Sequence, residues 1–548
     1  MGSSETDFDV IVVGGGFGGL ATAIAAHDHG LRVAILEKSD WVGGAASYSG
    51  GQVWVPGNHI AARAGAVDSP EAGIEYLLSA GAEESSHFDP ALAAEWMYHA
   101  SATVAYLEGR AGMAWRVIPD YPDYYFPQAR ASRSWGRYLT SAPVLLAELG
   151  DDATRVRRTP HFPSGLTYQE MLDWGGMAKR ASWPASVFTA RREAGVVTFG
   201  EGLIAQLYRA VRESGIGVYF GSRASALLVE SGAVIGVQAE STDGARELRG
   251  SVVLATSSYD WDTDLAASFS DHALDRWGSL APTAVTGDGL HLARAAGAAI
   301  DKFPADAAPM LPGYRMAETT VDDPGFRTCF EHCLPHSMIV NAAGERFCDD
   351  SFYRAIVHGV LDERARNRRF FLIVDDEHRR RYGLGAVTPP GGEYPEGLVH
   401  SSSDLAELAT AVGIDPAGLV ATVASFNEHA ALGEDPLFGR GTNEAVRRFR
   451  GDPSDPINPL VGPLDTAPFH ALELTLVGTG IGASGIATTS YGRVIDESGA
   501  VIDGLYAIGA CASPRASGGA YNSGFTLSRS MTFGLRAAAS IANRKERS

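Results

Sequence analysis

Two short runs of aliphatic residues near the N-terminus have the pattern of buried parallel strands. They occupy residues 8–13 (FDVIVV) and 31–36 (LRVAIL). The stretch between them, from Leu20 to Gly30, is rich in alanine and ends at a glycine, which is typical of a helix. A strand, a turn, a helix and a second strand within about 30 residues form a βαβ crossover. The pattern therefore predicts the start of a parallel α/β sheet.

The pattern of apolar and polar positions predicts further strands along the chain. They are expected at residues 226–230, 234–240, 251–256 and 504–509. Residues 281–476 instead mix helical stretches, at 287–297 and 404–432, with proline-rich loops. The predicted fold class is α/β: a Rossmann-type domain formed from both chain ends (1–280 and 477–548), with an inserted α+β domain (281–476).

Charge balance and cysteine content exclude several classes of protein. With 45 Lys and Arg against 65 Asp and Glu, the formal net charge is −20, which is unsuited to binding nucleic acid. The four cysteines form no C-x-x-C pair, so neither a disulfide framework nor a metal site is predicted. The N-terminus is polar and acidic, unlike a secretory signal, and no apolar run approaches the roughly 20 residues of a membrane span. We therefore expect a cytoplasmic protein with no membrane span.

A glycine-rich turn between the first predicted strand and helix carries the first candidate chemistry. Gly14, Gly16 and Gly19 have the G-x-G-x-x-G spacing of dinucleotide sites, where glycines permit a tight turn and close approach of a pyrophosphate to the helix N-terminus. Glu37, after the second strand, stands where an acid accepts hydrogen bonds from ribose hydroxyls. The strand, turn, helix and acid together predict one dinucleotide site.

Three features favour FAD over NAD as this dinucleotide. Gly43 and Gly44 closely follow the acid, the chain has a single dinucleotide fingerprint, and the strand at 504–509 resembles the segment that returns to the flavin in flavoproteins. No His or Cys near residues 14–58 stands in a covalent attachment motif, so non-covalent FAD is expected. The other residues predicted to contact the cofactor are Lys38, Ser49, Gly50, Ala224, Gly509, Thr526 and Leu527.

Four blocks of sequence are similar to the 3-ketosteroid dehydrogenases, which belong to the fumarate reductase and succinate dehydrogenase flavoprotein superfamily. The blocks are residues 43–58 (GGAASYSGGQVWVPGN), 123–125 (DYY), 334–347 (LPHSMIVNAAGERF), and 521–524 (YNSG) followed by 531–534 (MTFG). They follow the order of the family along nearly the whole chain. The resemblance implies FAD-dependent desaturation of the bond next to a ring ketone, most directly that of a 3-ketosteroid.

The resemblance also implies roles for individual residues. Tyr521 and the backbone N–H of Gly524 would hold the ketone oxygen, and donors placed there stabilise the enolate that forms when the α proton leaves. Tyr353 would be the general base that takes this proton, supported by Tyr125, while the β hydride passes to the flavin. The spacing from Tyr521 to Gly524 resembles that of the Δ4-(5α)-ketosteroid dehydrogenases, which implies that Ser523 also joins the site.

Alternatives stay open at the level of sequence. The YNSG spacing points to the Δ4 branch and the DYY block to the Δ1 branch, so the desaturated carbon pair is open. A smaller cyclic ketone, of the cyclohexanone or 4-oxocyclohexanecarboxylate type, presents the same reacting atoms as a steroid. A fumarate reductase-like activity would use Arg354, which stands where those enzymes keep a proton-donating arginine. We expect an external electron acceptor, either quinone-like or a dye.

Overall fold

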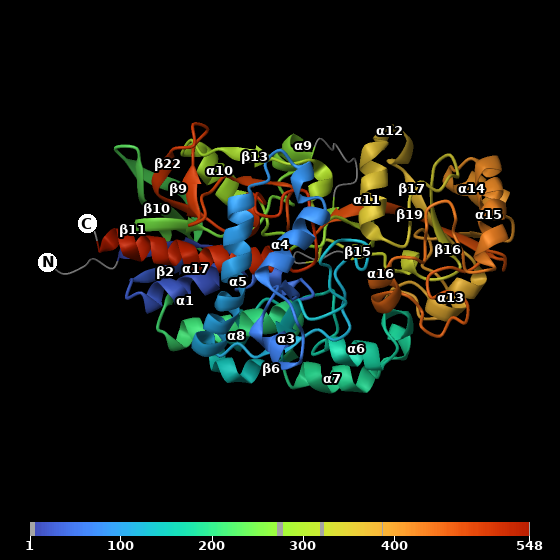
Figure 1. Cartoon of the computed structure of the whole chain (residues 1–548), viewed down its shortest axis with the longest axis horizontal. Coiled ribbons are helices and arrows are strands. Elements are labelled where there is room, and N and C mark those ends of the chain that lie inside the picture. The colour runs from blue at the N-terminus through green and yellow to red at the C-terminus, as the bar shows by residue number, and fades with distance from the viewer. Residues whose placement is uncertain (1–5, 271–277, 318–322, 386, 547–548) are drawn as a thin grey trace.

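Elements from the two chain ends gather on one side of the molecule, and elements from the middle of the chain gather on the other. The computed structural model describes residues 6–270, 278–317, 323–385 and 387–546. In Figure 1 the blue, green and red elements lie largely together, beside the yellow and orange elements.

An eight-stranded sheet is built from both ends of the chain. Its strands are β1 (Asp7–Val13), β2 (Val33–Leu36), β8 (Gly217–Tyr219), β9 (Arg223–Glu230), β10 (Ala233–Ser241), β11 (Gly244–Leu254), β21 (Arg493–Ile495) and β22 (Val501–Ala507). The main order is β21-β22-β11-β1-β2-β8, and β10 and β9 extend from β11. β1 is parallel to β2 and β11, and β11 is parallel to β22. This parallel sheet confirms the predicted α/β fold.

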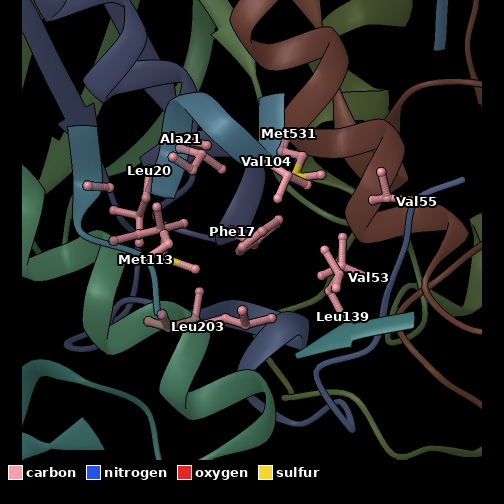
Figure 2. Close-up of a cluster of buried hydrophobic side chains, with 14 of the residues drawn as sticks. Phe17, Leu20, Ala21, Val53, Val55, Val104, Met113, Leu139, Leu203 and Met531 are labelled. Atoms are coloured by element: carbon pink, nitrogen blue, oxygen red, sulfur yellow. The ribbon is translucent and has the colours of Figure 1, made fainter. Parts of the chain in front are cut away.

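The first and last long helices of this half pack against each other. α1 (Phe17–Asp28) contacts α17 (Phe525–Lys545), as Figure 1 shows. Figure 2 shows the buried cluster around them, which also includes Val104 of α5 (Pro90–Ala111) and Leu203 of α8 (Phe199–Glu213). Phe17, Leu20 and Met531 belong to this cluster. The packing fixes the start of α17 relative to the glycine-rich turn that precedes α1.

A seven-stranded, mostly antiparallel sheet occupies the other half. Its strands are β12 (Gly278–Ser279), β14 (Leu311–Arg315), β15 (Phe326–Thr328), β16 (Ser337–Asn341), β17 (Phe370–Val374), β18 (His400–Ser402) and β19 (Phe469–Gly478). Successive residues of β16 point to opposite faces. Ile339 joins the core that contains Ile356 of α11 (Tyr353–Asp362), whereas Met338 and Val340 join the core beneath the helices at 405–430. The sheet is therefore covered on both faces.

One local expectation needs correction. The predicted helical stretch at 404–432 is two helices, α14 (Leu405–Val412) and α15 (Pro416–Ala430), because Gly413 takes a left-handed φ of +80° and Asp415 caps a new helix. The segment 334–347 contains a single strand, β16, which pairs with β17. Beyond Asn341 the chain makes a turn, closed by a 2.9 Å hydrogen bond from its N–H to the Glu345 carbonyl.

In the residues that the structure describes, no helix is both long and apolar enough to cross a membrane. The same residues contain no group of three or more His, Cys, Asp or Glu side chains that could hold a metal ion. The four cysteines are buried and free.

Candidate functional site

A cavity follows the edge of the eight-stranded sheet at which the parallel strands end. Gly14, Glu37, Ala255 and Ile508 line it, and these residues come directly after β1, β2, β11 and β22. Ligands of open α/β sheets bind at this edge, because the loops that leave the strands open a crevice there. The cavity therefore lies where a dinucleotide site is expected.

Most residues predicted to contact the cofactor line this cavity. They come from both chain ends: Gly14, Gly16, Glu37, Lys38, Gly43, Gly44, Ser49, Ala224, Gly509, Thr526 and Leu527. Gly19 and Gly50 are not among its lining residues. A Cβ at Gly19 would lie 2.1 Å from the Gly14 carbonyl oxygen, so this glycine lets α1 pack against the turn. The Gly50 carbonyl accepts a 2.7 Å hydrogen bond from the Tyr168 hydroxyl, which holds Gly50 against that side chain.

Gly14 and Gly16 are glycines for different reasons. Gly14 has a φ of +112°, and a Cβ there would lie 2.4 Å from the Ala255 carbonyl oxygen. A Cβ at Gly16 would meet no protein atom closer than the Gly43 oxygen at 3.8 Å, so the lack of a side chain keeps the cavity open at the N-terminus of α1. Gly16 caps α1 without a side-chain hydrogen bond, which leaves N–H groups for a phosphate. These residues fit the diphosphate of a dinucleotide.

Polar contacts fix the charged side chains of this cavity. The Glu37 carboxylate accepts hydrogen bonds of 2.9 Å from the N–H of Gly15 and 2.8 Å from the Ser39 hydroxyl. Glu37 therefore braces the glycine-rich turn, and its remaining lone pairs can accept from ribose hydroxyls. The Lys38 ammonium donates to Asp288 at 2.7 Å, which ties it to the first residue of α10 (Asp288–Ala295).

A second pocket is walled by aromatic residues. They are Tyr121, Tyr124, Phe330, Phe352, Tyr353 and Phe449. Ser523 hydrogen-bonds to Tyr124 in this wall, and Thr526, three residues farther on, lines the cofactor cavity. The segment 523–526 therefore connects the two cavities. Aromatic walls with a few polar groups are typical of sites that bind apolar ring compounds.

Three predicted catalytic residues gather around Tyr124, a tyrosine that the sequence did not single out. The Tyr124 hydroxyl makes a short hydrogen bond with Ser523 Oγ. The Tyr353 hydroxyl donates to the Tyr124 hydroxyl at 3.4 Å. The ring of Tyr521 lies 6.4 Å from that of Tyr124, centroid to centroid. Tyr353, Tyr124 and Ser523 thus form a continuous chain of hydroxyl groups.

Tyr125 is not among the residues that line this pocket. Its ring lies 5.9 Å from that of Phe352, and Arg354 opposes the rise that burial causes in its pKa. The DYY block offers two adjacent tyrosines, and sequence similarity alone does not show which of them faces the pocket. The supporting role assigned to Tyr125 stays a prediction.

Burial determines the protonation of the two principal tyrosines. It raises the pKa of Tyr353 and that of Tyr521 well above the ordinary value for tyrosine, and the nearby Tyr124 raises both further. Both side chains are therefore neutral phenols near pH 7. A neutral phenol can donate a hydrogen bond to a ketone oxygen, but it must lose its own proton in order to accept another.

Arg354 is buried beside Tyr521. Its guanidinium carbon lies 5.6 Å from the centroid of the Tyr521 ring, and its Nη1 donates to the Ala308 carbonyl at 3.2 Å. A dicarboxylate would need a second cationic side chain beside Arg354, and His336 is held elsewhere: its Nδ1 lies 2.7 Å from the Pro463 carbonyl oxygen.

A buried ion pair fixes the loop that carries Tyr124. Asp123 accepts hydrogen bonds from the Trp54 indole at 2.7 Å and from Arg137 at 2.8 Å. Arg137 also pairs with Asp68 at 2.8 Å, and its side chain is 1% exposed. Paired, hydrogen-bonded charges of this kind hold a loop in one geometry, because a displaced partner would leave a charge buried alone.

A second buried network joins the segment before Tyr353 to the residues around 435–450. Arg346 pairs with Asp350 at 2.9 Å and with Asp435 at 2.8 Å, and Arg440 pairs with Asp350 at 3.0 Å. Burial alone would raise the pKa of Asp350, but the two arginines lower it to about 2. The network therefore stays ionised and fixes two walls of the aromatic pocket relative to each other.

The parallel sheet, the glycine-rich turn and the cavity shared by both chain ends define a dinucleotide-binding flavoprotein. The chain matches the FAD binding domain family over residues 9–527 and belongs to that family. It is an FAD-dependent oxidoreductase.

Two relatives match over nearly the whole of both chains. The chain is 32% identical over 558 residues to 4-oxocyclohexanecarboxylate 2-dehydrogenase of Sinomonas cyclohexanicum, covering 99% of this chain and 94% of that protein. It is 29% identical over 580 residues to 3-oxosteroid 1-dehydrogenase of Mycobacterium tuberculosis, covering 98% of each. A solved structure of 3-ketosteroid Δ1-dehydrogenase from Sterolibacterium denitrificans, in complex with 1,4-androstadiene-3,17-dione, matches with a TM-score of 0.88 at 26% identity, covering 98% of this chain and 100% of that chain. The predicted resemblance to the ketosteroid dehydrogenases is confirmed.

Proposed function

We propose that the protein desaturates the bond next to the carbonyl of a cyclic ketone. The observation that carries this proposal is the chain of hydroxyl groups from Tyr353 through Tyr124 to Ser523, in an aromatic pocket that adjoins the cofactor cavity. The names of the relatives support it, because each describes a dehydrogenase of a ring ketone.

The ketone oxygen is held by Tyr521 and by the backbone N–H of Gly524. Gly524 caps α17 in a left-handed conformation, with a φ of +85°, and a Cβ there would lie 2.6 Å from the Trp54 nitrogen. The position therefore keeps a bare backbone beside Tyr521. Because negative charge grows on the ketone oxygen as the α proton leaves, donors fixed at that oxygen stabilise the transition state more than the substrate.

Tyr353 takes the α proton. Since it rests as a phenol, it must first lose its own proton along the chain of hydroxyl groups: Tyr353 gives a proton to Tyr124, Tyr124 gives its own to Ser523, and Ser523 releases one to solvent. FAD, when bound, accepts the β hydride. The substrate thus loses one proton and one hydride and becomes the enone.

We expect FAD to be held without a covalent bond, and the two electrons taken from the substrate would leave to an external acceptor, a quinone-like compound or a dye. Two substrate classes fit the reacting atoms equally: a 3-ketosteroid, and a small ring ketone such as 4-oxocyclohexanecarboxylate. Reduction of fumarate is less well supported. A dicarboxylate needs a cationic side chain for each of its two carboxylates, whereas the described lining of the aromatic pocket contains a single arginine, Arg450.

An anaerobic experiment tests the proposal. The oxidised holoenzyme is mixed with ring ketones of graded size, and the loss of flavin colour is followed together with formation of the enone. We expect at least one cyclic ketone to bleach the flavin and to yield its enone. Rapid reoxidation of the reduced enzyme by fumarate, abolished by Arg354→Met, would instead favour the fumarate reductase alternative.

A further inference from the structure

The aromatic pocket contains one permanent positive charge. Arg450 directly follows α16 (Glu444–Phe449) and lines the pocket together with Tyr124 and Tyr353. Its guanidinium carbon lies 3.8 Å from the centroid of the Phe330 ring and 5.6 Å from that of Phe449. Stacking on Phe330 holds the planar guanidinium against the apolar wall, with its N–H edge available for a partner.

The protein supplies no anion for this charge. Within the ranges that the structure describes, no Asp or Glu oxygen lies within 4.0 Å of an Arg450 nitrogen, and its guanidinium makes no hydrogen bond to another described residue. Neighbouring arginines differ: Arg448 pairs with Glu444 at 2.7 Å and with Asp120 at 2.7 Å, and Arg440 pairs with Asp350. Of these three arginines, Arg450, which lines the pocket, is the one without an acidic partner among the described residues.

The charge of Arg450 acts on the interior of the pocket. It adds to the effect of burial in lowering the pKa of His332, and it opposes the rise that burial causes in the pKa of Cys333; both side chains line the pocket. A half-buried charge of this kind is costly to keep without an anion, and a guanidinium matches the two oxygens of a carboxylate. A neutral steroid would leave this charge unpaired.

We propose that Arg450 binds an anionic group of the substrate, so that the enzyme acts on ring ketones that carry a carboxylate. The inference rests on the proposed function, because it takes the aromatic pocket as the substrate site. The carboxylate pairs with Arg450 while the ketone of the same ring is held by Tyr521 and Gly524. Arg450 is then a specificity-determining residue that discriminates between a carboxylate and a neutral substituent of the same shape.

A matched pair of ligands tests this assignment without turnover. Cyclohexanecarboxylate and cyclohexanecarboxamide have nearly the same shape, differ in charge, and lack the ketone that would reduce the flavin. Binding of each to the holoenzyme is measured by calorimetry. We expect the carboxylate to bind about 10- to 100-fold more tightly than the carboxamide, because hydrogen bonds between two charged groups add about this much to affinity. Equal affinities for the two ligands would overturn the proposal.

Three variants show whether Arg450 is responsible. Arg450→Met should bind both ligands equally and weakly, whereas Arg450→Lys should keep part of the preference, because it retains the charge but loses the planar fork. Arg448→Met removes an equal charge from the same segment and should keep the full preference. A preference that survives in Arg450→Met would also overturn the proposal. If Arg450→Met fails to fold, the ratio of the two affinities in the wild type and in Arg450→Lys still tests the proposal.

Turnover separates this inference from the proposed function. The rates of flavin reduction by 4-oxocyclohexanecarboxylate and its carboxamide should differ in KM, by a factor similar to that in binding, and the difference should vanish in Arg450→Met. If no ring ketone bleaches the flavin but the carboxylate still binds through Arg450, the proposed reaction is wrong and the anion site stands. If neutral ketones and the carboxylate are turned over equally well, the reaction stands and the anion site does not.

Discussion

The cofactor cavity and the aromatic pocket are built in opposite ways. The cofactor cavity is shaped largely by backbone, at turns that directly follow parallel strands, and its decisive residues are glycines. The aromatic pocket is shaped by large side chains from segments around residues 121, 330, 352 and 449, held together by buried ion pairs. The absence of side chains therefore shapes the cofactor cavity, whereas large side chains shape the aromatic pocket. We expect substitutions in the two sites to impair the protein in different ways.

The largest effect is expected where a side chain is added to the cofactor cavity. Gly16→Leu puts a bulky group where the protein itself leaves room, so the fold should persist while the diphosphate is excluded. We expect a folded, colourless protein, measured by circular dichroism and by flavin absorbance after purification. Gly30→Asn is the control: Gly30 ends the same helical region with a left-handed φ of +74° and no atom near its Cβ, so the protein should stay yellow.

Acid precipitation of the wild-type protein tests whether the flavin is bound without a covalent bond. It should leave the flavin in the supernatant.

The cofactor cavity could be predicted from the sequence because its determinants are local. Gly14, Gly16, Gly19 and Glu37 lie within one βαβ unit, whose strands and helix have their own apolar patterns. Gly19 packs against Gly14 of the same turn and Gly16 leaves room at the N-terminus of α1, whereas the contact of Gly14 with Ala255 is distant in sequence. Gly50 shows the limit: its partner, Tyr168, is distant in sequence, and no local pattern indicates that contact.

The aromatic pocket could be predicted only in part. Resemblance points to Tyr353, Tyr521 and Ser523, but it does not distinguish Tyr124, which hydrogen-bonds to Tyr353 and Ser523, from its neighbour Tyr125. The direction in which each tyrosine points depends on the loop that Asp123 and Arg137 fix. No sequence motif indicates Arg450. What distinguishes it is that no acidic side chain among the described residues lies near its guanidinium, and only the folded structure shows this.

The next largest effect should follow removal of the base. Tyr353→Phe should lower the rate of flavin reduction by about 10⁴-fold, the upper part of the range for acid–base catalysis, while substrate still binds. Exchange of the α hydrogen with solvent should stop as well, because exchange needs the base but not hydride transfer. Near-normal exchange in this variant would assign the base to another hydroxyl.

Tyr124→Phe and Tyr125→Phe form a matched pair for that assignment. If Tyr124 relays the proton of Tyr353, its loss should slow both flavin reduction and exchange more than the loss of Tyr125 does. A larger loss in Tyr125→Phe would restore the role that the sequence assigned to Tyr125.

A smaller loss is expected at the ketone oxygen. Tyr521→Phe removes one donor and should cost about 10²–10³ in rate, because the Gly524 N–H continues to stabilise part of the charge. Exchange of the α hydrogen should slow but persist, in contrast to Tyr353→Phe. Steady-state kinetics, together with exchange followed by NMR, distinguish loss of the oxygen donor from loss of the base. Complete loss of exchange in Tyr521→Phe would contradict the separate roles assigned to Tyr521 and Tyr353.

The smallest effect, about tenfold per pH unit, is expected from titration of Tyr353 itself. Burial raises its pKa above the ordinary value of 10, so below that pH the tyrosinate fraction is small and grows tenfold with each unit of pH. The rate of flavin reduction in the wild type should therefore rise from about pH 7 to about pH 9 without reaching a plateau. The residual rate of Tyr353→Phe should lack this rise, which makes the variant the control for effects of pH on folding or on FAD. A wild-type plateau below pH 8, with the fold intact, would show that the base has a pKa lowered below the ordinary value of tyrosine and that the base is not the buried phenol.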